Sequence, residues 1–199
     1  MKASFVRHRG ERDRIYVVRT SGDELSWEFP TYGDRLPHDL VHLVVEAAFD
    51  VREGFWGRVD SGVDPARANA AANRTGGPNK YAGFGSDLDE ILVAEALAAA
   101  PWSDADASDG RCIESVVDAC VEYGVAVPRT MNLGRVADVR SVLADLQHRW
   151  ASISTRGAID LSFDPGDLAT TFHAMSPVSH RPAGENEAPR TELRSLPRA

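Results

Sequence analysis

Hydrophobic and polar residues alternate along the first thirty positions, which is the pattern of antiparallel strands with one buried face. Segments with strand character cover residues 3–8, 13–20 and 24–30. The third segment places Leu25, Trp27 and Phe29 on one face, with polar residues between them. A turn at residues 21–23 joins the last two segments, so the chain is predicted to open with a hairpin extended to three strands.

Four later segments have the hydrophobic period of helices, and they cover residues 36–52, 86–100, 113–123 and 133–152. Asp34 and Ser86 are suited to cap the first two, and Gly124 is suited to end the third. The first helix is predicted to stop near Gly54. Residues 54–62 are then predicted to form a turn whose Phe55 and Trp56 dock on the core.

These patterns predict an α+β fold in which a small antiparallel sheet of three to four strands packs against about four helices. Residues 158–163 alternate like the first strands and can join their sheet. A single domain is expected over residues 1–173. Residues 174–199 contain four prolines and no aromatic residue, so a disordered tail is expected there. Residues 60–86 are irregular in composition, and whether they form a functional loop or lack fixed structure stays open.

Composition narrows the classes of partner. The net charge of the 199 residues is −8 and no basic cluster is interleaved with aromatic residues, so nucleic-acid binding is not expected. No run of 18 apolar residues and no secretory signal are present, so we expect a cytoplasmic protein without membrane contact. Cys112 and Cys120 lie too far apart on one helix for a disulfide, and without a CxxC pair we expect two buried thiols and no zinc finger.

The helix predicted over residues 36–52 carries the one unusual pattern of chemical groups. At 100° per residue, His38, Asp39, His42 and Glu46 fall within one narrow stripe, and nearly all other positions are apolar. Imidazole and carboxylate groups are ligands for zinc, iron and manganese, and an i, i+4 histidine pair directs both rings at one point. The stripe therefore predicts His38 and His42 as candidate metal ligands, with Asp39 and Glu46 as candidate acid–base groups.

Helix geometry limits which residues can share one ion. His38 and Glu46 are separated by about 12 Å along the axis, too far for one metal on a straight helix. The surviving pairs are His38 with His42, or His42 with Glu46, and each needs a third ligand from elsewhere. His8, His148 and His173 are the candidates, whereas His180 belongs to the predicted tail.

The sequence His38-Asp39-Leu40-Val41-His42 resembles the HExxH helix of zincin metallopeptidases, with aspartate in the position of the general-base glutamate. This resemblance implies a zinc site and covers five residues. Because aspartate is one methylene shorter than glutamate, its carboxylate would lie farther from the reacting group. The longer segment LPHDLVHLVVEAAFDVREGFWG resembles one in an uncharacterised bacterial protein family, and this implies no activity.

Three interpretations of the stripe stay open. Asp39 in the first helical turn and a His42–Glu46 hydrogen bond can be purely structural, in a non-enzymatic binding or regulatory protein. Alternatively, His38 and His42 bind zinc or another divalent transition metal, with a metal-dependent hydrolase as one such protein, or the stripe forms a polar site without metal. The discriminating observation is whether a third ligand converges on the two histidines.

Overall fold

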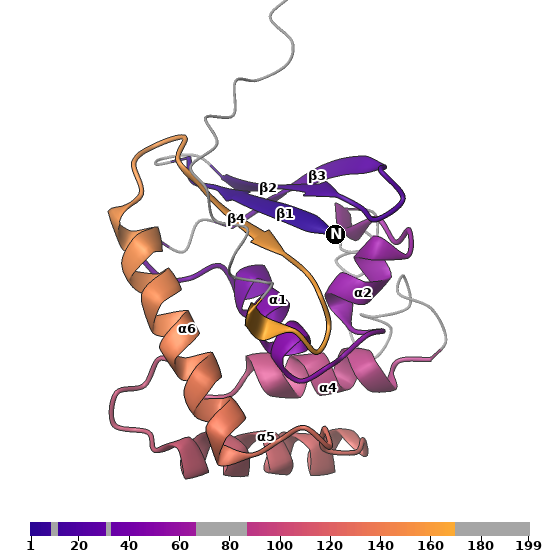
Figure 1. The fold of residues 1–199 in the computed structure, drawn as a ribbon, viewed down its shortest axis with the longest axis vertical. Helices are drawn as coiled ribbons and strands as arrows, with labels where there is room; N and C mark the ends of the chain where they lie inside the picture. The colour runs from indigo at the N-terminus through magenta and orange to yellow at the C-terminus, as the bar shows by residue number, and fades with distance from the viewer. Residues whose placement is uncertain (9–11, 31–32, 67–86, 170–199) are drawn as a thin grey trace, which may run out of the picture.

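Four antiparallel strands form one sheet in the order β3-β2-β1-β4 (Figure 1). The computed structural model describes residues 1–8, 12–30, 33–66 and 87–169. The strands are β1 (Lys2–Val6), β2 (Asp13–Val18), β3 (Glu24–Phe29) and β4 (Ala158–Ser162). The C-terminal strand pairs with β1, as the alternation in residues 158–163 suggested.

Helices cover one face of this sheet, which confirms the α+β prediction (Figure 1). Five helices lie within the described residues: α1 (His38–Ala48), α2 (Phe55–Asp60), α4 (Asp89–Ala98), α5 (Asp109–Tyr123) and α6 (Leu133–Ser152). The central α1 lies beneath the sheet and packs against α2, α4 and α6, and α5 lies beyond α4. Because neighbours surround it, α1 buries every residue from Leu43 to Ala48.

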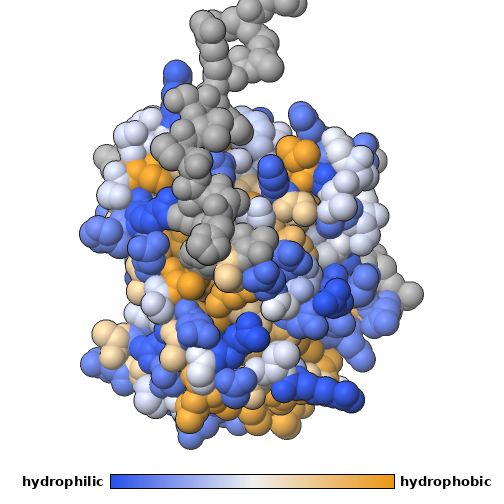
Figure 2. Space-filling view, in the orientation of Figure 1, coloured by the Kyte–Doolittle hydropathy of each residue, from blue (hydrophilic) through white to orange (hydrophobic). Residues whose placement is uncertain are grey.

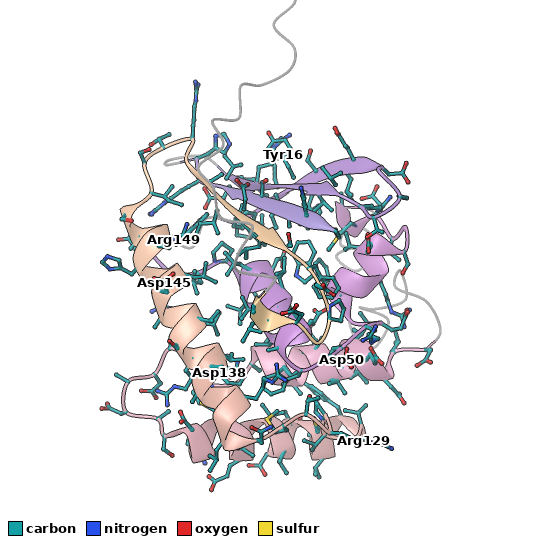
Figure 3. All side chains as sticks on the ribbon, in the orientation of Figure 1. Tyr16, Asp50, Arg129, Asp138, Asp145 and Arg149 are labelled. Carbon is teal, nitrogen blue, oxygen red and sulfur yellow. The ribbon has the colours of Figure 1, made fainter. Side chains whose placement is uncertain are left out.

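The alternation along the strands separates the core from solvent as predicted. Trp27 and Phe29 are buried on β3, whereas Leu25 is half-buried. Ile159 on β4 is completely buried in the same core. On the opposite face, Tyr16 is 42% exposed and lies above the sheet, away from the helices (Figure 3). One sheet face therefore packs on the helices while the other faces solvent.

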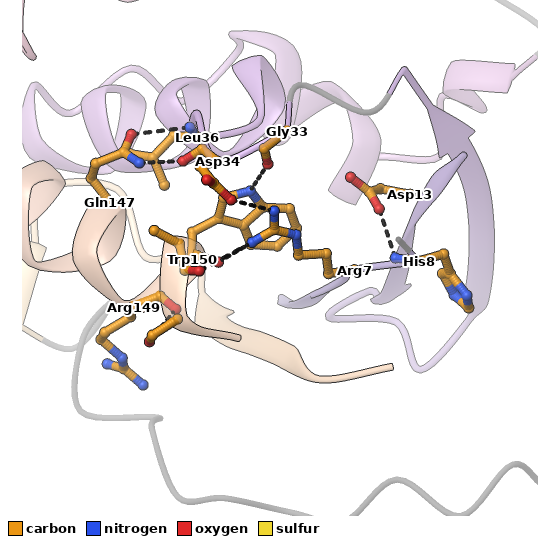
Figure 4. A network of polar contacts seen from close by, with 11 residues as sticks. Arg7, His8, Asp13, Gly33, Asp34, Leu36, Gln147, Arg149 and Trp150 are labelled. Carbon is orange, nitrogen blue, oxygen red and sulfur yellow. Dashed lines mark hydrogen bonds and ion pairs between the residues drawn. The ribbon is translucent and has the colours of Figure 1, made fainter. Parts of the chain in front are cut away.

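A buried arginine fixes the segment that leads into α1 (Figure 4). Arg7 donates to the Trp150 carbonyl at 2.6 Å and to Asp34 Oδ1 at 2.6 Å. Gln147 accepts from the Leu36 amide at 3.2 Å. These bonds tie the segment that leads into the central helix to α6 and to the residue that follows β1.

Four local predictions were wrong. Ser86 is not the N-cap of α4, because that helix begins at Asp89 and its N-cap is Leu88. Asp34 does not cap α1, whose N-cap is Pro37 without a side-chain bond, since the Asp34 carboxylate is bound to Arg7. The helix ends at Ala48 instead of near Gly54, because Asp50 adopts a left-handed φ of 58°. The segment expected to be a turn forms the short helix α2, and Trp56 is completely buried as expected.

The last two helices end where predicted, although α5 begins at Asp109 and not at residue 113. Gly124 ends α5 in the left-handed conformation at φ 71°, and α6 covers the predicted residues. Figure 2 shows hydrophobic side chains gathering at the end of the molecule where α5 lies, and Val121 is 74% exposed. None of the described helices is both long and apolar enough to cross a bilayer. The predicted tail at 174–199 and most of segment 60–86 lie outside the described residues.

Candidate metal centre

Two polar side chains of helix α1 are buried. His42 is 4% exposed and Glu46 is completely buried. A charged or polar group without water must find partners inside the protein, because an unpaired buried group destabilises the fold by several kcal/mol. The partners of these two residues therefore define the site.

The His42 ring lies between two carboxylates. Its Nδ1 is 3.1 Å from Glu46 Oε1, at hydrogen-bond distance, and its Nε2 is 4.0 Å from Glu95 Oε2. The ring of His38, one turn earlier, meets it edge-on with centroids 4.6 Å apart. Both nitrogens of one buried imidazole thus face a carboxylate, and the second histidine lies beside it.

Glu46 is held from the opposite side by the start of α2. Its Oε2 accepts the Trp56 amide at 2.9 Å. Gly54 lies so close that a Cβ at this position would be 2.6 Å from the same oxygen. The carboxylate therefore occupies a fitted recess between His42 and the first turn of α2, directed away from Glu95.

Asp39 is half-buried and bonded through both its side chain and its backbone. Trp27 Nε1 donates to Asp39 Oδ2 at 3.2 Å, and Trp56 Nε1 donates to the Asp39 carbonyl at 2.8 Å. Burial raises the pKa of the Asp39 carboxyl, while the charge of His42 and the Trp27 bond oppose this rise. The side chain is thus fixed by the sheet.

The buried pair has displaced pKa values. Burial alone lowers the pKa of His42, but the hydrogen bond and charge of Glu46 outweigh it, and the charges of Glu95 and Asp39 act in the same direction. The pKa of His42 therefore lies above its usual value. Burial also raises the pKa of Glu46, against the stabilising bonds from His42 and the Trp56 amide.

Three potential ligands converge at the exposed end of this arrangement. One donor atom each from His38, His42 and Glu95 lies within 4.8 Å of the others. A tetrahedral zinc ion with bonds of about 2.0–2.1 Å separates its ligand atoms by about 3.3–3.4 Å. The donors in the cluster lie up to 4.8 Å apart, so side-chain rotations would have to bring them closer together around one ion.

Glu95 is the member that the sequence analysis missed. It lies on α4, is half-buried, and faces α1 because these two helices pack together. One turn earlier on α4, Ile91 packs with Phe55 and two further apolar residues. The Phe55 ring also contacts His42, with centroids 5.9 Å apart. One of the three donors, His42, thus lies beside an apolar ring that packs with Ile91.

The other predicted residues are placed differently. Within the described part of the chain, neither His8 nor His148 belongs to the three-residue cluster. His173 and His180 lie outside the described residues. Glu46 does not join His42 in the cluster but contacts the other nitrogen of its ring.

A separate pocket of about 820 Å³ lies near the first residue of β1, lined among others by Thr20, Arg52 and Phe163, and none of the clustered residues lines it. Comparisons of the chain with protein-family models, with curated proteins and with solved structures found no match. The geometry of the site is therefore the basis for assigning a function.

Proposed function

We propose that this protein binds a divalent transition-metal ion, with zinc the best match, through His38, His42 and Glu95. The observation that supports this proposal is the convergence of three donors from two helices within 4.8 Å. Two imidazoles and a carboxylate are a donor set that zinc accepts, and catalytic zinc sites use this combination with a fourth position open.

The alternative is a non-enzymatic binding or regulatory protein in which the stripe is structural. The contact of 3.1 Å between His42 and Glu46 favours that interpretation, because it provides a partner for both groups. It does not account for the other ring nitrogen, since Nε2 and the Glu95 carboxylate are separated by 4.0 Å, beyond hydrogen-bond distance. A cation between them would satisfy both.

Metal content and affinity test the proposal. Elemental analysis of the purified protein, followed by calorimetric titration of the chelated protein with zinc, iron(II) and manganese(II), should detect one bound ion per chain. His38→Ala and Glu95→Gln should each weaken binding at least about 100-fold, since each removes one of three ligands. His148→Ala and Glu122→Gln, both at exposed positions, serve as matched controls and should bind as the unmodified protein does. If the protein is isolated without metal and binds none of the three ions, the metal-binding proposal is wrong and the structural interpretation stands.

A metal-dependent hydrolase is a second candidate, supported by the position of Asp39. This residue lies between the two histidine ligands in sequence, and its carboxylate is close enough to feel the charges of His42, His38 and Glu95. A bound divalent ion would supply Lewis-acid activation. Asp39 would hold or transfer a proton, and the bond from Trp27 to Oδ2 would orient its carboxylate.

One variant distinguishes simple metal binding from metal-dependent hydrolysis. Asp39→Asn keeps the size of the side chain and should leave metal stoichiometry unchanged. If the zinc-loaded protein hydrolyses peptide or ester substrates, Asp39→Asn should reduce turnover by about 10²–10⁴-fold, the usual contribution of a positioned acid–base group. Turnover that Asp39→Asn does not change would remove Asp39 from the acid–base role.

A further inference from the structure

We propose that Glu46 is a positioning residue that fixes the tautomer of His42, with the proton on Nδ1 and the lone pair on Nε2 directed toward the ligand cluster. This inference rests on the proposed metal site and names the residue that prepares it. Histidine can bind a metal through a ring nitrogen only when that nitrogen carries no proton. The tautomer of His42 therefore decides whether the cluster can accept an ion.

The hydrogen-bond contacts of Glu46 determine the tautomer of His42 when the Glu46 carboxylate is ionised. Oε1 lies 3.1 Å from His42 Nδ1, and Oε2 accepts the Trp56 amide at 2.9 Å. An ionised carboxylate has no proton to donate, so Nδ1 must supply the hydrogen of the first contact. In the neutral imidazole, Nε2 is then the acceptor, and it faces Glu95 at 4.0 Å.

That arrangement sets two electron-rich atoms opposite each other. Neither Nε2 of this tautomer nor the Glu95 carboxylate can donate a hydrogen bond to the other. A cation between them is attracted to both. His38 completes the group of donors on the same side, within 4.8 Å. The geometry on the Glu46 side of the ring thus determines the chemistry available on the opposite side.

The fold prevents Glu46 from turning away. Its side chain is completely buried, and a Cβ at Gly54 would lie 2.6 Å from Oε2 and 2.8 Å from Cδ. Trp56, whose amide binds the carboxylate, is itself completely buried, and its indole donates to the Asp39 carbonyl at 2.8 Å. Glycine at position 54 allows α2 to approach closely enough to hold the carboxylate in place.

Glu46→Gln separates this role from simple packing, because glutamine has the same shape but one acceptor and one donor end. The Trp56 amide requires the acceptor oxygen on its side, so the NH2 group faces His42 Nδ1. That nitrogen must then become an acceptor, and the proton moves to Nε2. The reverse orientation of the amide would place two donors together and leave the buried Trp56 N–H without a partner. The variant should therefore fold while presenting the wrong nitrogen to the metal.

The test combines a spectroscopic measurement on the metal-free protein with a binding measurement. Long-range ¹H–¹⁵N spectra of the imidazole rings, recorded well above the histidine pKa and assigned with His42→Ala, report which nitrogen carries the proton. We expect Nδ1–H in the unmodified protein and Nε2–H in Glu46→Gln. Zinc affinity measured by calorimetry should fall about 10–100-fold in the same variant, the usual effect of removing such an outer partner. Glu122→Gln, at an exposed position on α5, should change neither quantity.

The outcomes distinguish this inference from the proposed function. An Nε2–H tautomer in the unmodified protein overturns the inference without any variant, even if zinc binds. An unchanged tautomer in a folded Glu46→Gln protein overturns it as well. If the tautomer is Nδ1–H and switches in the variant while no metal binds the unmodified protein, Glu46 controls His42 but the metal-binding proposal fails.

Discussion

Trp27 joins the sheet to the candidate metal centre, and Trp27→Ala should lower the free energy of unfolding by about 3–5 kcal/mol, the usual range for removing a buried aromatic side chain. The indole is 5% exposed and packs on the rings of Trp56 and Phe55, with centroids 5.8 and 6.3 Å away. Its Nε1 also donates to Asp39 Oδ2 at 3.2 Å, a bond to a carboxylate that contributes about 1.5–3 kcal/mol.

Trp27→Phe divides this loss into packing and hydrogen bonding. Phenylalanine keeps an aromatic ring against Trp56 but leaves Asp39 without the indole donor, so about 1.5–3 kcal/mol should be lost. Equilibrium urea unfolding followed by circular dichroism gives both values, provided that the m value stays constant. Tyr16→Ala, on the exposed face of the same sheet, should change stability by no more than about 0.5 kcal/mol. A loss below about 1 kcal/mol in Trp27→Ala would refute the burial of this sheet face.

Three further predictions follow from the charges and close contacts of the site. In metal-free protein, the free energy of unfolding should fall as pH rises above about 6.5, because Glu46 raises the pKa of His42 in the folded state. Urea titrations of His42→Gln should lack this dependence on pH. With zinc present at 100 times its dissociation constant, the free energy of unfolding should instead rise by about 2.7 kcal/mol near neutral pH. Thermal melts should show that this gain disappears when chelator is added or when the pH is lowered. Gly54→Ala should destabilise the protein by about 1–3 kcal/mol in urea unfolding, because the new Cβ would lie 2.6 Å from Glu46 Oε2. Gly110→Ala in α5 is the control. Its Cβ would meet only an ordinary contact at 3.7 Å, so this variant should stabilise the protein by about 0.5–1 kcal/mol.

The fold could be predicted where one periodicity held over a whole element. The alternation around Trp27 and Ile159 gave the buried sheet face, and the stripe of α6 gave its bounds. The prediction failed where the chain turns sharply after α1. There the left-handed Asp50 ends the helix, and α2 starts so close that a Cβ at Gly57 would lie 1.6 Å from the Arg52 carbonyl oxygen. Such an approach depends on tertiary packing and leaves no periodic signal.

The candidate site, like the fold, could be predicted only where residues on one helix share a regular spacing. Helical spacing on α1 brings His38 and His42 together, and the length of the helix correctly separates Glu46 from His38. Glu95 had no comparable signal, because a glutamate between alanines on α4 has the same local pattern whether it faces solvent or another helix. What the sequence does show is a histidine and a glutamate inside an apolar helix. Since a buried imidazole and carboxylate require compensation, partners for both had to exist, but only the packing of α4 and α2 against α1 identifies Glu95 and the Trp56 amide.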